Sequence, residues 1–223
     1  MNVLYFLLER LKFIRQFYAI GATPYLELKR KIEAEEEPFV PPYSEDGEPP
    51  FISEWVEADE SLHVLAYACI SMLAASLHLY FETWVTLSRQ PVSPELKKTV
   101  FKKRGWLEGY KEHFSQRLRI NFDEQPTNFH LLEEVILARN MIEHPSSITS
   151  IRTQFTEADL RKLRRPFFVD EQEAALLHTK GERAWLLPPT LHVTDAQLIA
   201  AVSEVERLAT WFESEIEKCL SGK

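Results

Sequence analysis

Residues 62–81 most constrain what this chain can fold into, because they are apolar on nearly every side of a helix. A helix without a polar face is stable only when other helices, or lipid, surround it. Within residues 64–81, the longest apolar run, one histidine and two serines interrupt the apolar residues, which favours a buried helix over a membrane span. We therefore expect a central helix from Phe51 or Glu54 to Leu87, enclosed in a helical bundle.

The other helices are predicted from apolar spacing and from residues that start or stop helices. Gly21 and Pro24 divide the first apolar pattern into two pieces. Thr156 and Thr194 each precede an acid or amide by three residues, a capping-box pattern that begins a helix. The expected helices are residues 3–20, 24–37, 94–118, 131–144, 156–165 and 194 to the end of the chain.

Two segments are expected to lack helix. Residues 38–50 contain five Pro, one Gly and several acids, which is typical of a mobile, acidic, Pro-rich loop. Residues 167–193 are predicted to be irregular, with a small hairpin that pairs residues 174–178 with 183–187. We expect residues 1–223 to form a single all-α domain. Its four principal helices carry helical additions at the N-terminus and the hairpin insertion before the last helix.

Charge is concentrated in one part of the sequence. The net charge is −8, which argues against a general nucleic-acid binder. Residues 33–60 hold eleven Asp or Glu and no Lys or Arg, so the remaining residues sum to +3 (−8 plus 11). A local basic surface is therefore compatible with the composition. The acidic segment is either a solvated insertion or a cover for basic helices, and the sequence leaves both open.

The candidate chemistry lies at the end of the helix expected over residues 131–144. Its apolar stripe faces one way, and Arg139, Asn140 and His144 fall on the opposite side. Pro145 disfavours the α conformation at His144, so His144 closes the helix, where the dipole favours a positive charge. An arginine can stabilise charge on phosphoryl oxygens and a histidine can move a proton. The alternative is an ordinary solvated surface with one weak Arg139–Glu143 ion pair. The stripe consists of Leu131, Val135, Ala138 and Ile142.

The six residues from Arg139 to His144, Arg-Asn-Met-Ile-Glu-His, resemble the Arg-Asn-x3-His signature of HEPN domains. This resemblance implies a small helical bundle that cuts RNA without metal, at a composite site formed when two protomers pair. It assigns catalysis to Arg139 and His144, with Asn140 as the accompanying polar residue. It implies a homodimer, an RNA substrate, and an antitoxin or other protein as a further partner. The setting it implies is a toxin or defence system.

Two basic clusters are candidates for contacts with the RNA backbone. The first includes Lys102 and Lys103 within residues 94–118. The second includes Arg161, Arg164 and Arg165, close in sequence to His144. Both clusters are equally compatible with solvated helix faces.

Metal and cofactor sites are not expected. Glu60-Ser61-Leu62-His63 is half of a di-metal carboxylate motif that needs two such units. Gly is too scarce for a phosphate-cradling loop, and Cys69 and Cys219 are expected to be reduced, buried thiols. The N-terminus lacks the pattern of a signal peptide, so we expect a cytoplasmic protein without membrane contact.

The leading hypothesis is a metal-independent endoribonuclease that cleaves RNA by attack of the 2′-hydroxyl. The rival is a non-catalytic HEPN-like module that dimerises or binds a partner or nucleotide, favoured by the overall acidity and by Glu143 inside the motif. A plain helical scaffold is the third interpretation.

Overall fold

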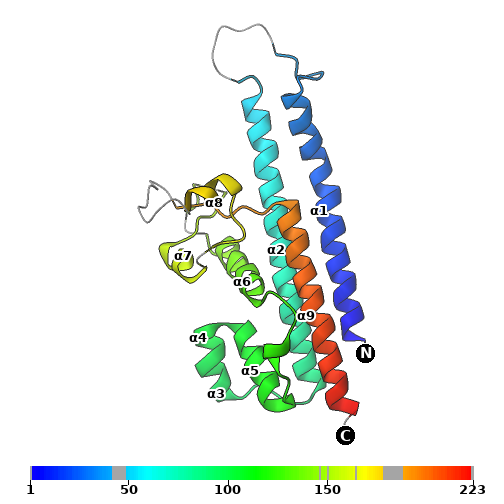
Figure 1. Cartoon of the computed structure of the whole chain (residues 1–223). Coiled ribbons are helices and arrows are strands. Elements are labelled where there is room, and N and C mark those ends of the chain that lie inside the picture. The colour runs from blue at the N-terminus through cyan, green and yellow to red at the C-terminus, as the bar shows by residue number, and fades with distance from the viewer. Residues whose placement is uncertain are drawn as a thin grey trace. The chain divides into compact units, whose positions relative to one another are not determined.

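The computed structural model describes residues 2–41, 49–145, 147–149, 151–163, 165–177 and 188–221. Over these residues the protein is all-α, as predicted: it has no strand, and its one isolated bridge pairs Gln154 with Thr190. The elements, labelled in Figure 1 where there is room, are the helices α1 (Val3–Glu33), α2 (Ile52–Leu87), α3 (Pro94–Leu96), the π turn η1 (Lys97–Phe101), α4 (Lys102–Arg104), α5 (Trp106–Leu118), the 3-10 turn η2 (Phe122–Glu124), α6 (Phe129–Glu143), α7 (Glu157–Leu163), α8 (Glu171–Leu177) and α9 (Asp195–Ser221).

The chain divides into two compact units, which are described separately. Unit 1 comprises residues 1–14, 72–137 and 199–223, and unit 2 comprises residues 15–71 and 138–198. The core of unit 1 is aromatic, with Phe81 of α2 in ring contact with Tyr110 and Phe114 of α5 and with Phe212 of α9. Phe81, Phe114 and Phe212 are each at most 1% exposed. Removing such rings from water stabilises this unit.

Unit 2 is held together by buried side chains and by contacts between segments far apart in sequence. Phe155 and Phe168 are almost fully buried. The Tyr67 hydroxyl of α2 donates to the Leu191 carbonyl at 2.5 Å. Around the bridge, the Phe155 amide donates to the Pro189 carbonyl at 3.0 Å. These bonds fix the irregular segments that precede α7 and α9.

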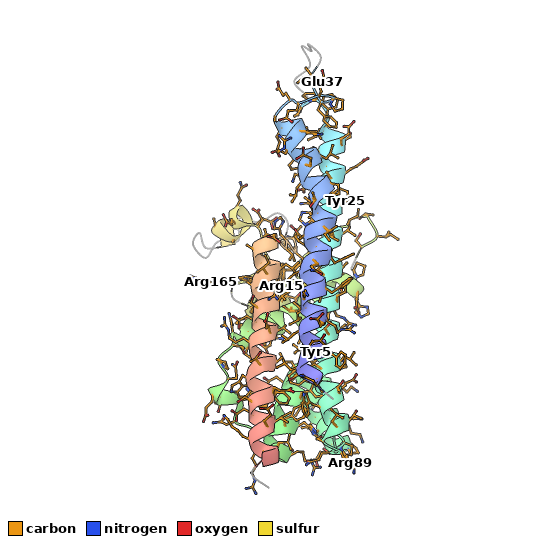
Figure 2. The ribbon with its side chains drawn as sticks, turned by 90° about the vertical axis from the view of Figure 1, so that its right-hand side faces the viewer. Tyr5, Arg15, Tyr25, Glu37, Arg89 and Arg165 are labelled. Carbon is orange, nitrogen blue, oxygen red and sulfur yellow. The ribbon has the colours of Figure 1, made fainter. Side chains whose placement is uncertain are left out.

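The predicted break at Gly21 and Pro24 is wrong, because α1 is one continuous helix of 31 residues that includes Pro24. Figure 2 shows this helix without interruption, with Tyr5 and Tyr25 labelled along it. A Cβ added at Gly21 would lie 2.9 Å from a Leu65 methyl carbon, so Gly21 permits close approach of α1 to α2. The glycine serves helix packing there, and tertiary packing outweighs its local preference.

The helix predicted over residues 94–118 is interrupted. Gly105 has φ 94° and ψ 168°, a conformation that is essentially restricted to glycine, and it separates α4 from α5. Before it, η1 contains the wider π turn, in which the Lys102 amide donates to the Lys97 carbonyl. This Gly was the sequence signal for the break.

The predicted hairpin is also wrong in its first half, because residues 171–177 form α8. The Asp170 side chain accepts from the Gln172 amide at 2.8 Å, which caps the helix, and Glu171 and Glu173 occupy the first turn. Residues 183–187, the predicted second strand, lie outside the described residues, as does most of the predicted loop, residues 42–48.

The two predicted capping boxes are confirmed. A further cap begins α6, where the Asn128 side chain accepts from the Leu131 amide at 3.2 Å. Thr156 and Asp159 exchange side-chain bonds with each other's amides, and so do Thr194 and Gln197. The central helix α2 begins at Ile52, between the two predicted starts Phe51 and Glu54, and ends at the predicted Leu87.

Helix α2 is long and apolar enough to cross a membrane by length and composition. Its most apolar window is 56% buried inside the protein. A core helix of a soluble protein has the same character, so this fold is compatible with a soluble protein.

Candidate functional site

Helix α6 presents the candidate motif at its C-terminal end. Ala138 is 1% exposed, whereas Asn140 and His144 are exposed, so the motif lies opposite the buried side as predicted. The His144 amide donates to the Asn140 carbonyl at 3.0 Å, so the backbone bonding of α6 ends at His144. Of the predicted stripe, Leu131 and Val135 are buried with Ala138, and Ile142 is half-buried.

Arg139 is engaged by its neighbours on the same helix. Its guanidinium forms an ion pair with Glu143, each side chain being 37% exposed, and its Nη1 donates to Asn140 Oδ1 at 3.0 Å. Asn140 therefore points its amide oxygen at Arg139, one residue earlier. Within the described part of the chain, no side-chain bond or ion pair holds the His144 imidazole. The motif thus offers one paired cation and one accessible imidazole about one helical turn apart.

The predicted RNA-binding residues lie in both units. Lys102 and Lys103 are exposed on α4 in unit 1. Arg161 is exposed on α7 in unit 2, where it pairs with Glu157 at 3.8 Å, and Arg165 follows that helix (Figure 2). Arg164 lies outside the described residues. Unit 2 therefore contains both the motif and the second basic cluster.

A second cluster of ionisable groups, the Asp59 cluster, lies part-buried in unit 2. Asp59 accepts from Lys29 Nζ at 2.5 Å and pairs with the Arg152 guanidinium. Arg152 Nε also donates to Glu60 Oε1 at 2.7 Å. His63 Nε2 lies 3.5 Å from Asp59 Oδ2, and the His63 and His192 rings meet edge to face at 4.8 Å. The cluster comprises Lys29, Asp59, Glu60, His63, Arg152 and His192.

Burial sets the protonation of this cluster. His63 is 4% exposed, and burial, together with positive Arg152 and neighbouring His192, lowers the pKa of His63 to about 4. Burial is the largest single influence on Asp59 and opposes its ionisation, but the hydrogen bond from Lys29 and the charges of Lys29 and Arg152 together outweigh burial, so the pKa of Asp59 is lowered. At neutral pH the cluster holds a neutral imidazole beside an ionised carboxylate.

The Asp59 cluster is structural rather than catalytic in character. It joins α1 and α2 to the loop segments that contain Arg152 and His192. The described residues contain no group of three or more His, Cys, Asp or Glu able to hold a metal ion. Sequence reasoning noticed Glu60 and His63 but missed their cationic partner. Arg152 is 92 residues from Glu60, and no local pattern links them.

Both cysteines are free thiols, but the predicted burial is confirmed for only one of them. Cys69 is buried, and burial raises its thiol pKa to about 11. Cys219 is half-buried, and its Sγ donates to the Leu118 carbonyl at 3.2 Å.

Comparison with models of known protein families, with curated proteins and with solved structures found no match to this chain. The likeness to HEPN domains therefore rests on the six motif residues and on the helical character of the chain.

Proposed function

We propose that this protein is a cytoplasmic, metal-independent endoribonuclease of HEPN type, with Arg139, Asn140 and His144 as its site. The observation that supports it is that a half-exposed guanidinium and an exposed imidazole lie within the last turns of α6. Both groups are reachable by a phosphodiester, and both have the chemistry that cleavage requires. A toxin or defence role, with an antitoxin as protein partner, belongs to the same proposal.

The reaction uses the nucleophile that RNA itself carries. The 2′-oxygen attacks the adjacent phosphorus, and His144 accepts the 2′-hydroxyl proton. As the bond to the 5′-oxygen breaks, an imidazolium donates a proton to that oxygen, leaving a 2′,3′-cyclic phosphate. Arg139 binds two phosphoryl oxygens in a bidentate manner, which lysine cannot reproduce. Asn140 holds the Arg139 side chain, as their 3.0 Å hydrogen bond already does.

One motif supplies one imidazole, whereas the reaction uses a base and an acid. We therefore propose a homodimer in which two copies of the α6 end meet at a two-fold axis, so that the second His144 donates the proton. Light scattering at micromolar concentration tests this directly. A monomer would contradict the two-histidine mechanism.

The deciding experiment is cleavage of single-stranded RNA in the presence of EDTA by the wild type and three variants. His144→Ala and Arg139→Lys are expected to reduce the rate by about 100-fold or more, the usual contribution of such groups. His130→Ala removes an exposed histidine from the start of the same helix and is expected to leave the rate unchanged. Products should end in 2′,3′-cyclic phosphate. Loss of folding in His144→Ala or Arg139→Lys, seen by circular dichroism, would make these residues structural and remove the proposal.

The second candidate is a non-catalytic HEPN-like module that dimerises or binds a partner or nucleotide. The Arg139–Glu143 ion pair favours it, because the carboxylate occupies the guanidinium and repels a phosphate. In that case RNA remains intact with wild type and variants alike, while the dimer persists.

Lys102, Lys103, Arg161, Arg164 and Arg165 are proposed to contact the RNA backbone. Such contacts carry little sequence preference, and each releases about one counterion, so affinity falls as salt rises. Replacing Lys102 and Lys103 with Glu should weaken RNA binding and reduce its salt dependence. An unchanged salt slope would exclude these lysines from the interface.

A further inference from the structure

Unit 1 contains a surface cavity of about 720 Å³ that the proposed cleavage site does not use. It lies among the end of α2, the π turn η1 and α5. The residues that decide its chemistry are His78, Glu82, Thr83, Lys97, Phe101 and Tyr110. Its volume falls in the range of ordinary small-molecule sites, roughly 300–1,000 Å³.

One wall of the cavity is aromatic and preorganised. The Phe101 ring meets Tyr110 edge to face at 5.1 Å, and a Cβ on Gly109 would lie only 2.3 Å from that ring. His78 Nε2 lies 3.4 Å from the Tyr110 hydroxyl and its Nδ1 lies 3.8 Å from Glu82. The wall therefore combines flat rings with polar edges, in fixed positions relative to one another.

The π turn brings a cation to the same cavity. Lys97 and Phe101, the first and last residues of η1, both line it. Wider π turns of this kind are frequently found at functional sites. Lys97 is exposed, and none of the described residues forms an ion pair with it. The same is true of Lys98, Lys102 and Lys103, whereas the neighbouring Arg104 is paired with Glu108 at 2.6 Å.

We propose that this cavity binds one nucleoside phosphate, either as a free mononucleotide or as one residue of an RNA strand. The base lies against the half-buried Phe101 ring, as bases do on aromatic side chains in single-strand binding proteins, and the buried Tyr110 ring supports Phe101 from behind. Lys97 pairs with the phosphate, and Glu82 accepts hydrogen bonds from a base amino or ring N–H. Lys97 lines the cavity, whereas Lys98, Lys102 and Lys103 do not, so the phosphate is placed at Lys97.

Guanine is the expected base. It presents a ring N–H and an amino group on one edge, which match the two oxygens of the Glu82 carboxylate. Uracil offers a single N–H flanked by carbonyls that the carboxylate repels. The inference rests on the proposed function only where the nucleotide belongs to an RNA substrate.

The test is calorimetric titration of the full-length protein with GMP, UMP and a short single-stranded RNA at low ionic strength. Lys97→Met is expected to weaken GMP binding by about tenfold, the usual scale of one charge-assisted contact. Lys98→Met is the matched control: it removes the same charge from the next residue, which does not line the cavity, and binding should change by less than about threefold. Glu82→Gln should reduce the preference for GMP over UMP.

Equal losses in the two lysine variants would show a general basic surface and overturn the cavity site. Binding of glycine or glutamate as tightly as GMP, or no binding of any probe, would also overturn it. GMP binding without binding of the RNA identifies the free nucleotide as the ligand, and a tighter RNA complex with the same Lys97 dependence identifies the strand. The cleavage proposal and the nucleotide-binding proposal are tested independently. His144→Ala should bind GMP as tightly as the wild type does, and a failure to cleave RNA would contradict only the cleavage proposal.

Discussion

Two arginines of unit 2, Arg139 and Arg152, both meet carboxylates but are held in different ways. Arg139 pairs with Glu143 on its own helix, at a surface where both side chains are 37% exposed. Arg152 joins Asp59 and Glu60, more than 90 residues away in sequence, and these carboxylates are 18% and 26% exposed. An exposed pair on one helix contributes little to stability, whereas a part-buried network leaves uncompensated charge when one member is removed. Arg139 is therefore free to exchange its partner for a phosphate, and Arg152 is committed to the fold.

Acidification should affect the Asp59 cluster most. The pKa of His63 is about 4 in the folded protein, below the unfolded value of 6.5, so the unfolded chain takes up this proton first. Stability therefore falls as pH drops from 6.5 towards 4, by about 3 kcal/mol from this group. The lowered pKa of Asp59 acts in the same direction, because its contribution is lost as pH falls through the folded value.

Urea unfolding measured between pH 7 and pH 4 checks this prediction. The charged and titratable groups around His63 are Lys29, Asp59, Glu60, Arg152 and His192. His63→Gln should flatten the pH dependence across this window, whereas His144→Ala, at the exposed motif, should leave it unchanged. A slope that survives His63→Gln would place the titrating group elsewhere.

Removal of Arg152 is the next largest effect. Arg152→Ala leaves Glu60 without its cation and Asp59 with Lys29 alone, and we expect a loss of about 2 kcal/mol in the free energy of unfolding. Solvent access to the Arg152 side chain keeps the loss below that of a fully buried pair. Arg161→Ala, which breaks an exposed pair on α7, is the control and should cost less than about 0.5 kcal/mol. Equal losses would show that the Asp59 cluster is as weak as a surface pair.

Replacing Arg139 with Ala should hardly change the free energy of unfolding. Arg139→Ala removes an exposed i,i+4 pair, worth about 0.5 kcal/mol or less. Chemical unfolding beside Arg152→Ala measures the contrast directly. A loss above about 1.5 kcal/mol would assign Arg139 a structural role, because surface substitutions rarely cost so much.

The contrast between Arg139 and Arg152 also shows which features could be predicted from the sequence. Helix α2, the capping residues Thr156 and Thr194, and the exposed side of α6 were predictable because each depends on residues a few positions apart. Gly21 was misread because its role depends on Leu65, which lies across a helix interface. Asp170 was an available cap signal for α8 that the hairpin prediction did not take into account.

The same rule applies to the candidate site: groups that are close in sequence could be predicted, and contacts between distant segments could not. The motif was visible because Arg139, Asn140 and His144 are close in sequence, and the Arg139–Glu143 ion pair was predictable from its i,i+4 spacing. Arg152 was not visible, since its carboxylates come from another helix. Lys97 belongs to the helix predicted over residues 94–118, but its place at a cavity depends on a π turn that apolar spacing does not encode.

The smallest expected effect is a change in RNA affinity, and it tests most directly whether Arg139 is available to a ligand. Glu143→Gln removes the carboxylate that occupies Arg139 and keeps the size of the side chain. RNA affinity should rise about two- to threefold, the equivalent of one exposed ion pair no longer competing with phosphate. Glu133→Gln removes the same charge nearer the start of α6 and should have a smaller effect, because screening weakens charges about 10 Å away or more. Fluorescence anisotropy at two salt concentrations separates the two variants. If Glu143→Gln instead weakens RNA binding, Glu143 orients Arg139 for the phosphate, and the ion pair belongs to the working site rather than opposing it.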